Sequence, residues 1–390
     1  MGYLYRSFQT IMNMNKYKLA ASLFTVLCLM QAGDLLAQTK TINIQSTAVP
    51  FLLISPDARS GGMGNLSLAM SPETNDLFGN TAKLPFIKED RAFLINYTPW
   101  LKDLGLNDVY LASAGFYKKL NNNNSINTSL RFFSLGDIQF TDQDNNALAS
   151  QRPSEFSYDF GYSMLLSDQF SAGVTLRYIH SQLVQGSYGA SAINYKAGNT
   201  LSSDISLFYK QNVNFEGFHG GLLLSNLGGK ISYTNESKNK SFIPANIGLG
   251  IGYLNRMDNS NSIEFGVDVN RLMVPTTPID GDEATRNQYY SQSVVSSWFN
   301  SFTSKYGMPL GESLKVSAGA EYNYNDRFFL RAGYYMDNNK NLGNMQYFTV
   351  GTTFQYQQSK FHISYLVPSG GGITKNPLSN TLRFGTVFNF

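Results

Sequence analysis

The stretch LRFGTVFNF, residues 382–390, ends the chain and has the alternating pattern of a β-strand. Every second residue is apolar or a threonine: Leu382, Phe384, Thr386, Phe388 and Phe390. Soluble domains usually end in a polar and mobile segment. The strand that closes an outer-membrane β-barrel instead needs one face for lipid and one for the lumen. We therefore predict an all-β fold, a transmembrane antiparallel β-barrel.

The first residues have the pattern of a secretory signal peptide. Lys16 and Lys18 precede an apolar stretch over residues 19–30, and Ala37 follows at a suitable distance for cleavage. This run is too short for a spanning helix. Cys28, the only cysteine, lies within it. A mature chain that begins after residue 37 would have no disulfide, no thiol catalysis and no cysteine-ligated metal.

Composition favours a barrel over a helical membrane protein. No further run of 18 apolar residues follows, yet 14% of residues are aromatic and only 15% are charged. Removing residues 1–37 takes away three basic groups and one acidic group, from totals of 30 and 27, and leaves a net charge near +1. Such a balance gives no reason to expect a nucleic-acid partner.

Alternation along the rest of the chain predicts about fourteen strands, most of them longer than the strands of a soluble sandwich. Their connections alternate between short and long, as between the periplasmic turns and outer loops of such barrels, with both termini periplasmic. The predicted spans are 92–100, 108–119, 126–140, 154–165, 169–183, 200–211, 215–227, 244–254, 261–272, 313–324, 327–337, 346–358, 360–367 and 380–390.

Two regions do not fit the wall of the barrel. Residues 38–90 form a segment that either hangs in the periplasm or fills the lumen as a plug, and 91–390 form the barrel. In the 273–312 connection, five apolar residues share one face at helical spacing. The spacing predicts a short amphipathic helix. This helix either caps the mouth of its own barrel or binds a partner or another membrane component. The five residues are Val294, Val295, Trp298, Phe299 and Phe302.

The sequence offers little for catalysis. The three histidines are His180, His219 and His362, and only His180 and His362 have a serine within two positions. No nucleophile-elbow pattern surrounds them, and Asp142 and Asp144 fall in a predicted turn, where aspartate is common. We predict no catalytic residue, cofactor or metal site.

Several segments carry a family resemblance. PFLLISPDARSGGMG (residues 50–64), SLRFFSLGDIQFTDQDNN (129–146) and GAEYNYNDRFFLRAGY (319–334) resemble PorV (LptO) proteins of the type IX secretion system, which belong to a wider FadL-like group of barrels. The chain departs from the family at Asn80-Thr81-Ala82, where Asn-Pro-Ala is common. The most specific element is the plug motif, with Pro56, Asp57, Arg59, Gly61, Gly62 and Gly64.

The resemblance implies a function in secretion. PorV-type barrels receive cargo at the type IX translocon barrel through the cargo's C-terminal signal domain, and bring it to a surface sortase or attachment complex. Recognition would then use the outer loops 184–199, 228–243 and 273–312, while outer-membrane lipid surrounds the wall. Asp57 and Arg59 would fix the plug to the wall, as most buried ion pairs have a structural role. The alternative is that they bind cargo or ligand.

Two other functions remain open. The wider FadL-like group implies transport of hydrophobic small molecules, for which the inward glycines Gly248, Gly250 and Gly252 could leave space beside a plug. A lipid A deacylase activity, suggested for the family, would need a nucleophile and base within hydrogen-bond reach, such as His362 and Ser364 on one strand face.

Overall fold

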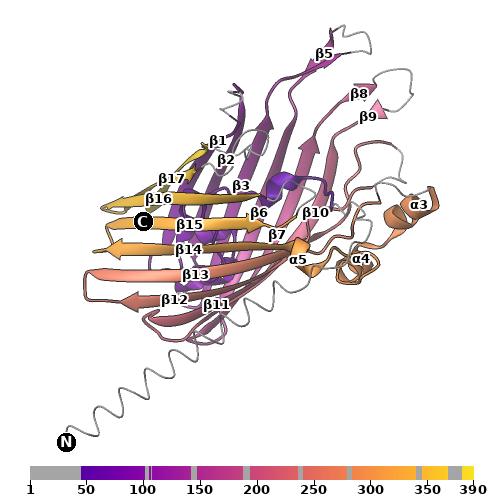
Figure 1. Ribbon diagram of the computed structural model, residues 1–390. Coiled ribbons are helices and arrows are strands. Elements are labelled where there is room, and N and C mark those ends of the chain that lie inside the picture. Colours follow the sequence, from indigo (N-terminus) through magenta and orange to yellow (C-terminus); the bar gives the residue numbers. More distant parts are fainter. Residues whose placement is uncertain are drawn as a thin grey trace, which may run out of the picture. The chain divides into compact units, whose positions relative to one another are not determined.

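The computed structural model confirms the predicted barrel (Figure 1). Fourteen antiparallel strands close into one sheet, in the order β1-β18-β17-β16-β15-β14-β13-β12-β11-β10-β7-β6-β3-β2. The predicted signal peptide and the turn with Asp142 and Asp144 lie outside the described residues. The structure describes residues 45–101, 105–106, 108–141, 147–187, 194–235, 240–278, 283–339, 345–367 and 380–390.

All strands of the wall pair with their neighbours in the chain, so the topology is up-and-down. The long connections gather at one end of the barrel, here called the loop end, and the short ones at the other, the turn end. The strands are β1 (Arg91–Pro99), β2 (Val109–Lys119), β3 (Asn124–Leu135), β6 (Ser154–Leu165), β7 (Phe170–Gln182), β10 (Gly198–Lys210), β11 (Gly217–Gly228), β12 (Asn246–Arg256), β13 (Asn261–Leu272), β14 (Leu314–Tyr324), β15 (Phe328–Asp337), β16 (Gln346–Tyr356), β17 (Ser359–Val367) and β18 (Leu382–Asn389).

The third predicted strand, 126–140, was too long. β3 ends at Leu135, and Gly136 adopts a left-handed conformation with φ of 80°. The next backbone N–H, of Asp137, donates to the Asp108 carboxylate at 2.7 Å. The chain then continues as β4 (Ile138–Thr141), which pairs with β5 (Ala147–Gln151) in a separate hairpin. A similar short pair, β8 (Gly186–Ser187) with β9 (Asn194–Tyr195), occupies the next loop.

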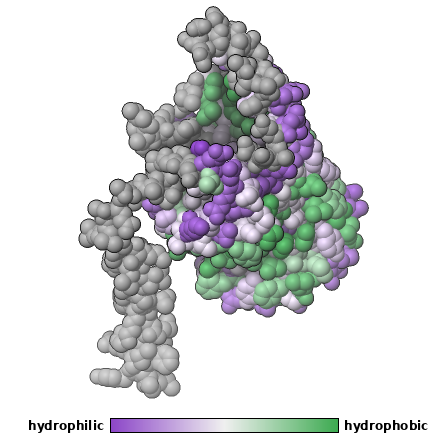
Figure 2. All heavy atoms as spheres, turned by 90° about the vertical axis from the view of Figure 1, so that its right-hand side faces the viewer, coloured by the Kyte–Doolittle hydropathy of each residue, from purple (hydrophilic) through white to green (hydrophobic). Residues whose placement is uncertain are grey.

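Each wall strand has one polar and one apolar face. In β6, Ser157 and Asp159 are fully buried toward the lumen, whereas Tyr158 and Phe160 are exposed on the outside. The same alternation continues in the strands beside it and gives the flank of the barrel the hydrophobic surface seen in Figure 2. An apolar exterior around a polar lumen is the arrangement that a lipid environment requires.

The closing strand behaves as the sequence predicts. β18 pairs with β17 on one side and β1 on the other, and the Phe390 N–H donates to the Arg91 oxygen at 2.9 Å. Arg383 and Val387 are buried, and Phe390 is 60% exposed on the outward face. The last residue thus completes the seam with its backbone and meets lipid with its ring.

Replacing Phe390 with aspartate should lower the amount of barrel in outer-membrane fractions. A carboxylate on the lipid face loses hydration at the place where the barrel closes. Immunoblots of membrane fractions measure this, with Phe390→Tyr as the matched control. Normal levels of the aspartate variant would contradict this account of the closing strand.

The segment before β1 lies inside the barrel and is here called the hatch (residues 45–90). It contains η1 (Pro50–Leu53), α2 (Ala58–Gly61), η2 (Thr74–Phe78) and η3 (Thr81–Phe86). α2 contacts β16, β17 and β18, while η3 contacts β6, β7 and β10 on the other side. Hatch and wall share a buried apolar cluster that includes Leu77, Leu84 and Leu94. No helix in the described part of the chain is long and apolar enough to cross a membrane.

Inward glycines of β12 let the hatch approach the wall closely. A Cβ atom on Gly250 would lie 2.7 Å from the Cβ of Leu68, and one on Gly252 would lie 2.7 Å from the Ala69 oxygen. Leu68 is buried against these glycines. The space beside β12 is therefore filled by the hatch.

Replacing Gly250 with leucine should destabilise the protein by about 1–3 kcal/mol, because the added side chain overlaps the hatch. Gly220 in β11 is the matched control, since the nearest atom to its Cβ position is 3.9 Å away. Urea unfolding in detergent micelles compares Gly250→Leu with Gly220→Leu. Equal unfolding midpoints would show that the hatch is not packed on β12.

Candidate functional site

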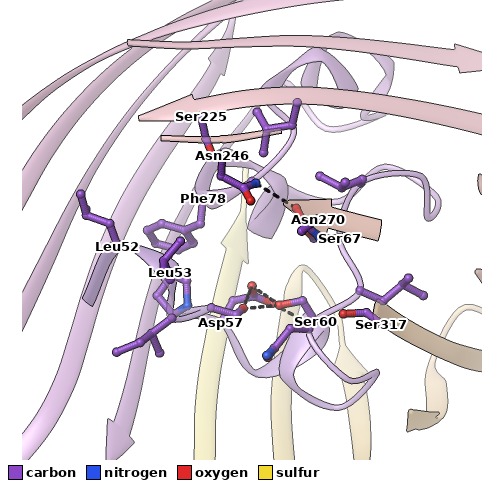
Figure 3. A pocket seen from close by; sticks show the side chains of 18 of the residues that line it. Leu52, Leu53, Asp57, Ser60, Ser67, Phe78, Ser225, Asn246, Asn270 and Ser317 are labelled. Atoms are coloured by element: carbon purple, nitrogen blue, oxygen red, sulfur yellow. Dashed lines mark hydrogen bonds between the residues drawn. The ribbon is translucent and has the colours of Figure 1, made fainter. Parts of the chain in front are cut away.

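A cavity of about 480 Å³ lies between the hatch and the loop-end half of the wall. Its wall residues come from strand ends at that side, such as Asn246 at the start of β12 and Asp337 at the end of β15. Figure 3 shows Leu52, Leu53 and Phe78 of the hatch in this space. The hatch thus lines this chamber on two sides: η1 packs at the loop end, against Val109 and Phe133, and α2 with the residues after it forms the floor.

The chamber is lined by both apolar and charged side chains. Arg177 reaches Asp159 and Asp204 at 2.8 Å each, so its charge is balanced within the wall. Arg383 is also buried and donates to the Asn65 side chain at 2.9 Å. Among the described residues, no carboxylate lies within 4.0 Å of Arg383. A ligand would meet apolar and polar side chains from both parts, such as Leu53 and Asp57 of the hatch and Leu223 and Arg383 of the wall.

The plug motif forms α2 and the residues on either side of it. Asp57 precedes α2 and accepts from the Ser60 N–H at 2.8 Å and from the Ser60 hydroxyl at 2.5 Å. This is a helix N-cap, which satisfies a backbone donor that the helix cannot. Pro56 lines the cavity next to it. We predicted from the sequence that Asp57 and Arg59 pair with each other. In the structure, no hydrogen bond or ion pair joins these two side chains.

Arg59 fixes the hatch to the wall. Its guanidinium lies 3.2 Å from Glu321 of β14 and 2.9 Å from Glu73, and donates to the Ser71 oxygen at 3.0 Å. Burial alone would lower the pKa of Arg59, but the Glu321 and Glu73 carboxylates raise it well above its ordinary value. Arg331 bonds Glu321 from the wall side. The result is a buried, charged network across the hatch–wall boundary.

The motif glycines lie where the hatch touches the wall backbone. Gly64 has φ of 68°, and its N–H donates to the Thr349 hydroxyl at 2.7 Å. A Cβ on Gly64 would lie 2.6 Å from the Tyr334 oxygen, and one on Gly62 would lie 3.0 Å from the Cα of Gly351. Gly61 packs against the Arg383 side chain. Because Gly62 and Gly64 meet wall backbone, a side chain at either position would push the hatch away from the wall.

Further anchors were not identified from the sequence. Asp268 of β13 accepts from the N–H groups of Ser67 and Leu68 at 2.7 and 2.8 Å, and Glu264 accepts from Ser71 at 2.8 Å. Their signal was the inward polar face of the ninth predicted strand, which carries Glu264 and Asp268. A buried carboxylate in a strand needs a partner, and the hatch backbone supplies it.

The departure at residues 80–82 is accommodated locally. Asn80 donates to the oxygens of Leu68 and Leu207 at 2.9 and 3.0 Å. Thr81, where proline is common in the family, has its hydroxyl 3.2 Å from that of Ser206 in β10. Hydrogen bonds to the wall therefore hold this turn where a proline ring would restrict it.

The five apolar residues of the 273–312 connection lie outside the cavity. Val294 and Trp298 are half-buried, and Val295, Phe299 and Phe302 are exposed on and just after α4 (Val294–Asn300). None of the five lines the chamber. Before them comes α3 (Glu283–Ser291), and α5 (Leu310–Ser313) follows. The predicted helix exists, but its apolar face points away from the protein.

The histidines do not form a hydrolytic site in the described residues. His362 bonds Thr353 at 2.6 Å, His219 bonds Glu264 at 3.1 Å, and His180 bonds Asn199 at 2.7 Å. Within the described part of the chain, no histidine is hydrogen-bonded to a serine. Acyl transfer by a serine needs that contact. The geometry therefore gives the deacylase alternative no support.

Comparison with known proteins agrees with the barrel and the motif. The sequence profile of a family described as "Type IX secretion system protein PorV" matches residues 37–279, more than half of the chain. The chain belongs to the PorV family. It is thus an outer-membrane component of the type IX secretion system. A search of curated proteins found no matching sequence.

Comparison with solved structures shows that this chain shares its fold with hydrocarbon channels. The toluene transporter TbuX of Ralstonia pickettii matches with TM-score 0.51 and 11% identity, over 86% of this chain and 98% of its own. TodX of P. putida matches with TM-score 0.50 and 10% identity, over 86% and 98%. The CymD channel matches with TM-score 0.51 and 10% identity, over 88% of this chain and 99% of its own. At these identities the likeness concerns the fold alone and confirms the FadL-like barrel.

Proposed function

We propose that this PorV-family barrel is a receptor that binds the C-terminal signal domain of secreted cargo and carries it from the translocon barrel to a surface attachment complex. Family membership supports a place in the secretion system. The observation that carries the receptor function is the chamber at the loop end, closed below by an anchored hatch. A chamber with a floor suits binding better than passage through the barrel.

The orientation is part of this proposal. We infer that the turn end, where the last strand closes at Phe390, faces the periplasm, so the loop end and its chamber face the cell exterior. The hatch itself begins at the loop end, where the Gln45 side chain donates to the Val274 oxygen and the Ala48 N–H to the Phe242 oxygen. The alternation of short turns and long connections supports this direction, because barrels of this type keep short turns on the periplasmic side. Cargo that has crossed the membrane would then meet the chamber and the loops around it.

Affinity purification from detergent-solubilised outer membranes, followed by mass spectrometry, tests the receptor function. We expect secreted proteins with an uncut C-terminal domain, together with the translocon barrel or subunits of the attachment complex. A barrel from a strain without the secreted cargo is the matched control. Recovery of the barrel with bound lipid and no cargo would contradict the proposal.

Binding or uptake of hydrophobic small molecules is the second candidate. The apolar side chains that the hatch contributes to the chamber, among them Leu52, Leu53 and Phe78, favour it. An uptake assay with an apolar ligand separates the two functions. Uptake that depends on this barrel and persists after deletion of the secretion machinery would support transport. If cells with the barrel take up no more ligand than cells without it, transport is excluded.

A further inference from the structure

Helix α4 is amphipathic in the reverse sense of a soluble surface helix. Ser297 and Ser301 are fully buried against the protein, and Val295 and Phe299 are 56% and 71% exposed. Soluble helices bury the apolar stripe and expose the polar one. The buried hydroxyls need no other partner, because Ser297 and Ser301 each donate to the carbonyl three residues earlier at 2.6 Å. Small residues inside and large apolar ones outside indicate an apolar environment around the helix.

The end of this helix is attached to the lipid-facing side of the barrel. Arg271 of β13 is on the same strand face as Phe265 and Val267, both exposed on the outside of the wall. Its guanidinium lies 4.6 Å from the centre of the Phe302 ring and donates to the Ser301 and Met308 oxygens at 3.1 and 3.2 Å. An outward residue of the wall therefore holds the connection at the loop end, where α4 is seen in Figure 1.

The apolar face of α4 continues the outer surface of the wall. Phe302 is 49% exposed. Phe265, on the outer face of β13, is exposed to a similar extent, 51%. Lys305, also exposed, lies with its ammonium group 4.8 Å from the Tyr306 ring. An exposed cation a few residues after an apolar helix face suits the level of anionic headgroups, with the apolar side chains below it.

We propose that α4 lies in the membrane interface at the loop end, with Val295, Phe299 and Phe302 among the lipid acyl chains. The occupant of this face is bilayer lipid, and the argument is its continuity with the lipid-facing wall through Arg271. This inference needs the membrane barrel but does not depend on cargo binding. It replaces the predicted partner contact of these residues with a contact to the bilayer.

The contact would hold neighbouring loops at a fixed height. Lys230, in the connection after β11, donates to the oxygens of Tyr290 and Gln292 at 2.7 and 2.8 Å, at the end of α3. Phe242 of the same connection packs against Tyr289 of α3. A helix anchored in the lipid interface therefore ties two long connections to the membrane surface beside the chamber.

Spin labels on single cysteines test this placement in the purified full-length barrel reconstituted into vesicles of phosphatidylethanolamine and phosphatidylglycerol. The only native cysteine, Cys28, lies in the predicted signal peptide, and a Cys28→Ser background also removes it from any unprocessed chain. Labels are placed at Phe299→Cys, at Val267→Cys on the wall as the lipid reference, and at Ser296→Cys on the polar flank of α4 as the matched control. Val295→Cys is a second test position in case the first variant does not fold.

We expect the labels at positions 299 and 295 to be poorly accessible to a water-soluble nickel relaxant and readily accessible to oxygen. In both respects they should resemble the label at position 267 and differ from the label at position 296. A label at 299 and 295 that is as open to nickel as the label at 296 would overturn the proposal. A label that is open to nickel in vesicles and becomes immobile only when the translocon barrel is added would also overturn it, in favour of a protein partner.

Discussion

Replacing Arg59 with alanine is expected to lower the free energy of unfolding by about 3–5 kcal/mol, because it leaves two buried carboxylates without their shared cation. Arg59 lies within 3.2 Å of both Glu73 and Glu321, and all three side chains are less than a tenth exposed. Lys360 and Arg331 would each retain one carboxylate. The direct contact between Arg59 of the hatch and Glu321 of the wall would be lost.

Urea unfolding of the purified barrel in micelles measures this effect, and gel mobility with and without heating reports whether the barrel is closed. The matched control is Arg152→Ala, since the Arg152–Asp137 pair is exposed to solvent and contributes little to stability. If Arg59→Ala unfolds at the same urea concentration as Arg152→Ala, the hatch is not held by this network.

Replacing Ser225 with tryptophan is expected to abolish recovery of cargo with the barrel while the barrel itself still assembles. Ser225 lines the chamber from β11 and is only half-buried, so an indole ring there enters the space that a ligand would occupy. Filling a binding cavity removes both contact surface and volume. Co-purified cargo, quantified by mass spectrometry relative to the barrel, is the readout.

Leu224→Trp is the matched control for this variant. Leu224 directly precedes Ser225 in β11 and pairs with Ile247, whereas Ser225 pairs with Asn246 at the chamber. The control therefore adds the same ring to the outer face of the same strand. Undiminished cargo with Ser225→Trp, or an equal loss with both variants, would contradict binding in the chamber.

The sequence predicted the wall of the barrel because a strand with one lipid face and one lumen face must alternate. That requirement shows in single strands such as residues 382–390, whose outward and inward sets the structure confirms. The prediction failed where a strand leaves the wall of the barrel. The alternating pattern continues past Leu135, but Gly136 turns the chain into a separate hairpin. Periodicity says nothing of such a turn.

The candidate site was less predictable because its contacts join distant parts of the chain. Arg59 and Glu321 are 262 positions apart, and no local pattern relates them. The nearest acidic neighbour, Asp57, is an N-cap instead. The helical spacing of residues 294–302 predicted α4 correctly, but which face is buried depended on Ser297 and Ser301, whose small size lets them pack closely.

Photo-crosslinking from inside the chamber tests the receptor account most directly. A photoreactive amino acid at Leu53, which lines the chamber from η1, is compared in secreting cells with one at Leu249, which is exposed on the outer face of β12. The account predicts a crosslinked product between residue 53 and the C-terminal signal domain of cargo, and none from residue 249. Crosslinks of residue 53 to lipid alone, with cargo secretion active, would contradict it.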